Sequence, residues 1–133
     1  MKKFFLIIIF TLTFNNLNAG YGSGELKLSS GVVNAFYQYL TNNKGNPLRF
    51  AVSQDGQWSY WFYCAYAQCV SDGDVDLVRL CERKATTSCS TFAVGRSVKW
   101  KNGINPGGKN ASFKKNMTFN EVKDKLTKLG FID

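Results

Sequence analysis

Residues 48–64 read LRFAVSQDGQWSYWFYC, and this stretch decides the fold class. Two runs rich in aromatic and aliphatic residues, 48–53 and 58–64, flank the sequence QDGQ. An Asp-Gly pair between such runs is typical of a β-hairpin, because both central positions of the favoured tight turn need positive φ. We therefore expect two antiparallel strands joined by a two-residue loop at Asp55-Gly56.

The position of this loop fixes the register of the two strands. Side chains alternate between the two faces of a sheet, so the residues of each strand form two sets, one on each face. One expected face holds the pairs Leu48–Tyr63, Phe50–Trp61 and Val52–Ser59. The other face holds Arg49–Phe62, Ala51–Tyr60 and Ser53–Trp58. The first face is typical of a buried core, and the second is mixed.

A second hairpin is expected where residues 89–94 and 97–101 flank Gly95-Arg96. Glycine at the first loop position suits a type II′ turn. The expected pairs are Ala93 with Val98 and Thr91 with Trp100. Together the two hairpins predict a four-stranded antiparallel sheet.

Three helices are expected around the hairpins. The first is capped by Ser29 or Ser30 and ends at the turn-forming residues 41–47. The second covers residues 72–86, with aspartates in its first turn and basic residues in its last. The third begins at the capping residue Thr118. The sequence thus predicts an α+β fold: a four-stranded antiparallel sheet packed on the second helix, with flanking N- and C-terminal helices.

The N-terminus has the order of regions that is typical of a cleaved secretory signal peptide. Lys2 and Lys3 form a short positive head, and an apolar run follows at residues 4–14. Ala19 precedes Gly20 at the expected cleavage site. The apolar run of about 11 residues is shorter than the roughly 20 that span a bilayer. We therefore expect a periplasmic or secreted protein with no transmembrane helix after cleavage.

The chain divides into segments of different composition. They are a signal peptide (1–19), an N-terminal helix segment (20–47), a disulfide-stapled α+β core domain (48–101), a flexible linker (102–117) and a C-terminal helix (118–133). Loss of the signal peptide removes two lysines and no acid, which lowers the net charge from +8 to +6.

The four cysteines agree with an oxidising compartment. They are Cys64, Cys69, Cys81 and Cys89, and an even number in a small exported domain is typical of two disulfides. We expect Cys64–Cys69 and Cys81–Cys89 among the three possible pairings, because the local structure brings each pair together. The alternative is a four-cysteine zinc site, which usually has closer spacings. We expect neither a metal nor a cofactor.

Several of these residues also form a pattern. It runs FAVS-x-DG from Phe50, YC from Tyr63, a helical Cys81, and C-x-x-FAVGR-x-V-x-W from Cys89. The pattern resembles a small exported domain of unknown function that is found in proteobacterial proteins. This resemblance covers about residues 48–101 and implies a fold without implying an activity. The N-terminal helix and the basic C-terminal tail lie outside it.

The composition excludes several classes of enzyme. The chain has no histidine, so it cannot build a Ser-His-Asp triad, a Cys-His nucleophile or a histidine metal site. Asp55 is explained by its turn, and no other acid has a position that suggests a cleft. We therefore predict that the protein is not an enzyme.

Two regions could bind a partner. Residues 58–63 carry large aromatic side chains on both faces of a strand, which is either a buried central strand or an exposed platform. Lysines crowd the final third of the chain, where they form either a solvated surface or a weak site for an acidic envelope surface. The candidate binding residues are Arg49, Trp58, Tyr60, Arg96, Lys99 and Trp100.

These observations predict a non-enzymatic secreted or periplasmic interaction or accessory protein that binds an envelope component or another protein. Its expected partner is an anionic envelope polymer, a glycan or a protein, and no nucleic acid is expected. The alternative is a carbohydrate- or peptidoglycan-binding module that uses the aromatic strand.

Overall fold

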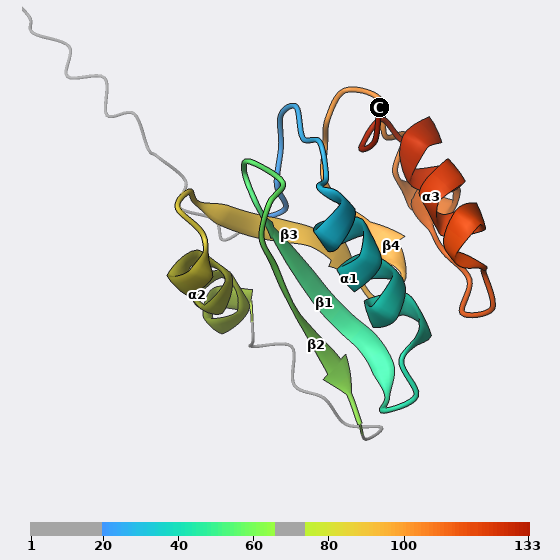
Figure 1. Ribbon diagram of the computed structural model, residues 1–133, viewed down its shortest axis with the longest axis horizontal. Helices are drawn as coiled ribbons and strands as arrows, with labels where there is room; N and C mark the ends of the chain where they lie inside the picture. Colours follow the sequence, from blue (N-terminus) through green and yellow to red (C-terminus); the bar gives the residue numbers. More distant parts are fainter. Residues whose placement is uncertain (1–19, 66–73) are drawn as a thin grey trace, which may run out of the picture.

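The computed structural model describes residues 20–65 and 74–133 (Figure 1). Its elements in chain order are α1 (Ser30–Thr41), β1 (Asn46–Ser53), β2 (Ser59–Cys64), α2 (Asp74–Lys84), β3 (Cys89–Val94), β4 (Ser97–Val98), the 3₁₀ helix η1 (Gly108–Ala111) and α3 (Phe119–Lys128). The strands form one sheet of order β2-β1-β3-β4, and every neighbouring pair is antiparallel. The predicted α+β fold with a four-stranded antiparallel sheet is confirmed.

Helices cover both faces of the sheet (Figure 1). α2 contacts β1, β2 and β3 from one side, whereas α1 lies on the other side with α3 beside it. β3 pairs with β1 rather than with β2, so α2 forms a crossover connection from β2 past β1 to β3. This connection leaves β2 at an edge of the sheet. The interpretation of the aromatic strand as a central strand is therefore wrong.

The register of the first hairpin follows the expectation over most of its length. The confirmed pairs are Arg49–Phe62, Phe50–Trp61, Ala51–Tyr60 and Val52–Ser59. The expected pairing of Leu48 with Tyr63 is wrong, because a bulge between Pro47 and Arg49 places Pro47 opposite Tyr63. Proline has no amide hydrogen for the ladder, so it is confined to irregular or edge positions of a sheet.

The loop between β1 and β2 is longer than expected. Only Gly56 has positive φ there, at 71°, so Asp55-Gly56 is not a type I′ pair. Instead, the Asp55 carboxylate accepts hydrogen bonds from Ser53 Oγ at 2.6 Å and from Gln57 N at 3.2 Å. Ser29 N donates to Gly56 O at 2.9 Å, which ties the loop to the start of α1.

The second hairpin agrees with the expectation only near its turn. Ala93 pairs with Val98, and Gly95 has the expected positive φ, at 57°. The pairing of Thr91 with Trp100 is wrong, because the segment at Tyr21 pairs with Thr91 instead.

The helices α1 and α3 each begin directly after a capping residue. Ser29 rather than Ser30 caps α1, because its hydroxyl accepts a hydrogen bond from Val32 N at 3.2 Å. The Thr118 hydroxyl likewise accepts from Glu121 N at 3.2 Å and caps α3. A side-chain acceptor at this position satisfies an amide that has no partner within the helix.

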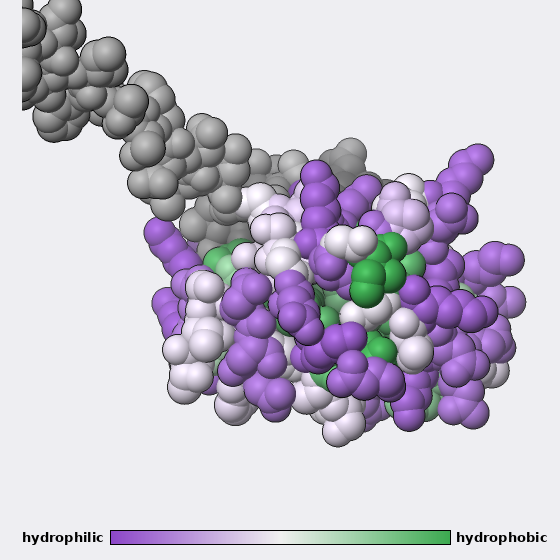
Figure 2. Space-filling model, turned by 90° about the horizontal axis from the view of Figure 1, so that it is seen from above, coloured by the Kyte–Doolittle hydropathy of each residue, from purple (hydrophilic) through white to green (hydrophobic). Residues whose placement is uncertain are grey.

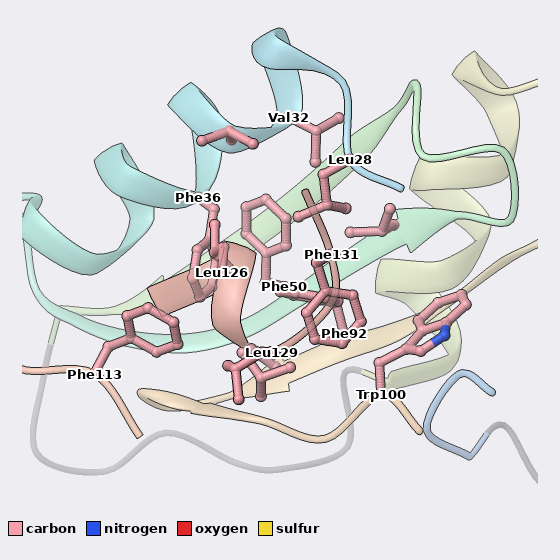
Figure 3. Close-up of a cluster of buried hydrophobic side chains, with 14 of the residues drawn as sticks. Leu28, Val32, Phe36, Phe50, Phe92, Trp100, Phe113, Leu126, Leu129 and Phe131 are labelled. Carbon is pink, nitrogen blue, oxygen red and sulfur yellow. The ribbon is translucent and has the colours of Figure 1, made fainter. Parts of the chain in front are cut away.

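The main core lies between the sheet and the α1–α3 layer (Figure 3). Phe36 of α1 is at its centre and makes edge-on contacts with the rings of Phe50, Phe92 and Phe113, each with centroids 5.2–5.3 Å apart. Phe113 belongs to the segment 102–117, which was expected to be only a linker. This segment therefore also contributes to the core.

The other face carries a smaller cluster beneath α2, made of Ala51, Leu77, Cys81 and Cys89. Cys81 and Cys89 form the expected disulfide, which links α2 to β3. Such a bond indicates an oxidising, extracytoplasmic compartment. No helix within the described ranges is long and apolar enough to cross a membrane.

Three expectations fall on residues outside the described ranges. They are the signal peptide at 1–19, the pairing of Cys64 with Cys69, and the first two residues of the helix expected at 72–86. Each of these stays a prediction.

Candidate binding groove

The expected binding residues do not form one surface. Trp100 is fully buried, and its indole N–H donates to Gly24 O at 2.9 Å. Its ring also packs over the backbone of Gly22, where an added Cβ would lie 2.0 Å from a ring carbon. Trp100 is therefore a core residue, and its expected role in binding is wrong.

Arg96 holds the β3–β4 turn against α1. Its guanidinium donates to Leu40 O, and the Tyr39 hydroxyl donates to Gly95 O at 2.6 Å. Burial raises the pKa of Tyr39 far above its ordinary value, although the charges of Arg96 and Arg49 oppose this shift. Tyr39 therefore remains a neutral hydrogen-bond donor, and Arg96 has a structural task in this turn.

Arg49, Trp58 and Tyr60 do not share an exposed platform either, because only Trp58 of the three is exposed. Tyr60 packs against the cluster beneath α2, and Lys84 Nζ lies 5.3 Å from the centre of its ring. Trp58 is 44% exposed at the start of β2. Lys99 lies elsewhere and lines a hollow of about 440 Å³.

The structure instead assembles a groove from the opposite face of the aromatic strand. A hollow of about 430 Å³ lies between the C-terminal end of α1 and β2, and Trp61 and Tyr63 line it. A second hollow of about 290 Å³ adjoins it, because Asn42 and Asn43 line both. We call the two hollows together the α1–β2 groove. Its lining residues are Gln38, Thr41, Asn42, Asn43, Lys44, Gly45, Asn46, Trp61, Tyr63, Cys64, Ala65 and Lys115.

Hydrogen bonds of Asn42 shape the polar wall of this groove. Asn42 ends α1, and its Nδ2 donates to Tyr39 O at 2.9 Å. Its Oδ1 accepts from Lys44 N and Gly45 N, both at 3.1 Å. Asn42 thus fixes the turn into β1, while the side chain of Asn43 remains exposed beside it.

The opposite wall is aromatic. Trp61 and Tyr63 are two residues apart on β2, so their side chains lie on the same face of the sheet. Their ring centroids are 6.1 Å apart at an angle of 54°, and Tyr39 supports Trp61 edge-on at 5.7 Å. Tyr63 is 39% exposed, so a ligand can reach its ring.

The combination of groups determines what this groove can bind. Aromatic rings offer apolar faces, and amide or hydroxyl side chains beside them supply hydrogen bonds that fix orientation. No acidic side chain lines either hollow among the described residues. The same ranges contain no group of three or more His, Cys, Asp or Glu that could hold a metal ion.

The groove lies where α1 and β2 end, at the bottom of Figure 1. The face at the top of that view is mainly hydrophilic, with hydrophobic residues in small separate patches (Figure 2).

Sequence reasoning missed Trp61 and Tyr63 as binding residues because their face was expected to be core. That expectation is correct for Phe50 and Val52, which are fully buried. α1 contacts both strands, but Tyr63 at the far end of β2 is 39% exposed, so the same face is buried at β1 and partly open at β2.

Comparison with models of protein families, with curated proteins and with solved structures gives no match. The resemblance of residues 48–101 to a small exported domain therefore stays a prediction.

Proposed function

We propose that the protein is a non-enzymatic periplasmic or secreted binding protein that holds a glycan of the cell envelope in the α1–β2 groove. The observation that carries this proposal is the exposed ring of Tyr63, supported by Trp61 and faced by amide side chains. Sugar rings present apolar C–H faces and polar edges, which match such a wall and rim.

The placement of the acids favours binding over catalysis. Hydrogen bonds from Ser53 and Gln57 lower the pKa of the Asp55 carboxyl, so this group stays an ionised acceptor within its turn. Glu82 accepts a hydrogen bond from Cys89 N at 3.1 Å and thereby joins α2 to β3. Neither acid lines the groove.

The proposed compartment supplies the ligand. The Cys81–Cys89 disulfide indicates an extracytoplasmic location, where envelope polymers are the abundant extended ligands. The N-terminal segment agrees with export to the periplasm or secretion. The basic surface adds a general attraction to acidic envelope components.

The test is binding of the mature chain to purified peptidoglycan sacculi and to chitotetraose, a soluble glycan with the same linkage. We expect Tyr63→Ala to weaken binding by roughly tenfold, because a central aromatic contact is worth more than about 1 kcal/mol. Tyr21→Ala is the matched control, since Tyr21 is 52% exposed and lines a different hollow. It should leave binding unchanged.

Tryptophan fluorescence adds an independent measurement. Trp100 is buried, and Trp58 precedes β2; neither residue lines the groove. A Trp58→Phe variant should therefore keep the change in emission on adding chitotetraose, which reports Trp61. Equal losses in Tyr63→Ala and Tyr21→Ala, or no binding by the unaltered chain, would overturn the proposal.

A further inference from the structure

We propose that the α1–β2 groove selects acidic glycans, whose carboxylates contact Lys44 and Lys115. This inference rests on the proposed function and narrows its ligand class. Lys44 lines the hollow of Trp61 and Tyr63, and Lys115 lines the adjoining one. A glycan that crosses both hollows therefore meets a cation in each.

The hollows of the two lysines adjoin each other. Asn42 and Asn43 line both, so these two residues lie where the hollows meet. Volumes of about 430 and 290 Å³ lie near the lower end of the range for small-molecule sites, which is about 300–1,000 Å³. A ligand that contacts both lysines must extend past Asn42 and Asn43, so it needs more than one ring.

The two lysines come from distant parts of the chain. Lys44 follows the C-terminal end of α1, whereas Lys115 lies in the turn before α3. The segment that carries Lys115 is held in place, because Phe113 is buried in the main core and Phe113 N donates to Arg96 O at 2.8 Å. The fold thus brings the second cation to the groove.

Within residues 20–65 and 74–133, no acidic side chain compensates the charge of the groove. The charged lining side chains of these ranges are Lys44 and Lys115, and neither forms an ion pair there. The hollow beside α3 differs, because Glu121 and Asp124 line it together with Lys125 and Lys128. A ligand carboxylate therefore gains attraction in the groove without opposing repulsion from a lining acid.

The aromatic wall and the lysines have different tasks in this inference. Tyr63 binds any sugar ring of suitable shape, which gives affinity without distinguishing charge. The lysines contribute only where the glycan carries an anion, and exposed ion pairs are screened by salt. Selectivity for acidic glycans should therefore fall as the salt concentration rises, while binding through Tyr63 remains.

The experiment compares two tetrasaccharides of the same β-1,4 backbone by calorimetry. One is chitotetraose, and the other alternates N-acetylglucosamine with N-acetylmuramic acid, whose lactyl groups add carboxylates. We expect the acidic glycan to bind about 5-fold tighter at low salt, since each exposed pair contributes a factor of roughly 2–5. The preference should shrink at 0.5 M salt.

The double variant Lys44→Gln/Lys115→Gln should bind both tetrasaccharides equally. Lys128→Gln is the control for a change in charge outside the groove, and it should keep the preference because Lys128 lines the hollow beside α3. A loss of the preference in Lys128→Gln that is half or more of the loss in the double variant would overturn the inference in favour of general attraction.

The outcomes separate this inference from the proposed function. Equal binding of both tetrasaccharides, still dependent on Tyr63, would refute acidic selection and leave the glycan site intact. No binding of either would refute both proposals. Vesicles of phosphatidylglycerol provide the last arm: binding to them that needs Lys44 and Lys115 but not Tyr63 would assign the lysines to a membrane surface and overturn the inference.

Discussion

The face of the sheet beneath α1 and the face beneath α2 receive alternate residues of the same strands, yet they are filled differently. Beneath α1, the rings of Phe36, Phe50, Phe92 and Phe113 interlock within one large cluster. Beneath α2, the buried cluster has only Ala51, Leu77, Cys81 and Cys89, with Tyr60 and Phe62 among the partly buried side chains around it. One face is held by packed apolar area, and the other combines less apolar area with a covalent link.

This difference follows from what each helix can bury. α1 has a broad apolar side, with Val33, Phe36 and Leu40 among its buried residues. α2 is more polar, so it presents fewer apolar residues to the sheet. Burial stabilises roughly in proportion to apolar area, so α2 needs another source of stability. The Cys81–Cys89 disulfide supplies it.

The strongest test of this comparison is Phe36→Ala. Phe36 is fully buried and contacts four other rings, so its removal leaves a cavity at the centre of the main core. We expect the free energy of unfolding to fall by about 3–5 kcal/mol in urea titrations followed by circular dichroism.

Leu77→Ala beneath α2 is the matched variant. Leu77 is also fully buried, but it belongs to the smaller cluster. Leu77→Ala should lower the free energy of unfolding by about 2–3 kcal/mol, near the lower end of the usual range for Leu→Ala. The reason is that the small cluster can collapse around the gap. A loss for Leu77→Ala as large as that for Phe36→Ala would contradict the unequal roles of the two faces.

The same alternation of residues explains how much of the fold could be predicted. Asp-Gly between two apolar runs located the first hairpin, and four of its cross-strand pairs are confirmed. The pairing between the two hairpins was harder to predict, because no feature of the sequence near β2 indicates whether β1 or β2 lies beside β3. The edge position of β2 is a property of the α2 crossing.

The N-terminal segment and Trp100 show why other parts could not be predicted. Residues 20–28 have no periodic pattern, yet Gly22 N donates to Thr91 O at 3.0 Å and Leu26 is in the main core. This segment takes the place expected for Trp100 beside Thr91, which leaves the indole to enter the core. A competition between distant segments for one position in a sheet cannot be recognised from the sequence near either segment.

The groove was missed for a related reason. Its walls come from the end of α1, the turn at 42–46, β2 and Lys115, and none of these segments is unusual by itself. The sequence pointed to the aromatic strand as a candidate but favoured Trp58 and Tyr60, which do not line the groove. The partly open face depends on how the end of α1, the turn at 42–46 and β2 come together in the fold.

The disulfide provides the next test, because it acts on the α2 face alone. Replacing both cysteines by alanine, Cys81→Ala/Cys89→Ala, should lower the free energy of unfolding by about 2–3 kcal/mol, as expected for a short closed loop. Hydrogen exchange should increase most strongly at the amides of α2. The amides of α1 should still exchange only through global unfolding, so their exchange should increase no more than the loss of global stability requires.

Reduction of a Cys64→Ala/Cys69→Ala variant, which keeps the Cys81–Cys89 disulfide, should reproduce that pattern. This comparison separates loss of the bond from loss of the cysteine side chains. Increased exchange spread evenly over α1 and α2 would show that the two faces open together. The α2 face would then not be a separate cooperative unit, and the disulfide would stabilise the whole molecule equally.

The smallest expected effect compares the two hairpin loops. It tests whether the packing on the α1 side of the sheet includes the β1–β2 loop. Gly56 and Gly95 both have positive φ, so alanine is strained at either position. A Cβ at Gly56 would also lie 1.8 Å from Lys27 O, whereas one at Gly95 meets nothing within 4 Å. We expect Gly56→Ala to cost roughly 1–2 kcal/mol more than Gly95→Ala in thermal unfolding, because the backbone over the first loop must move. Equal costs for the two variants would mean that residues 27–29 yield easily, and that the main core stops short of the β1–β2 loop.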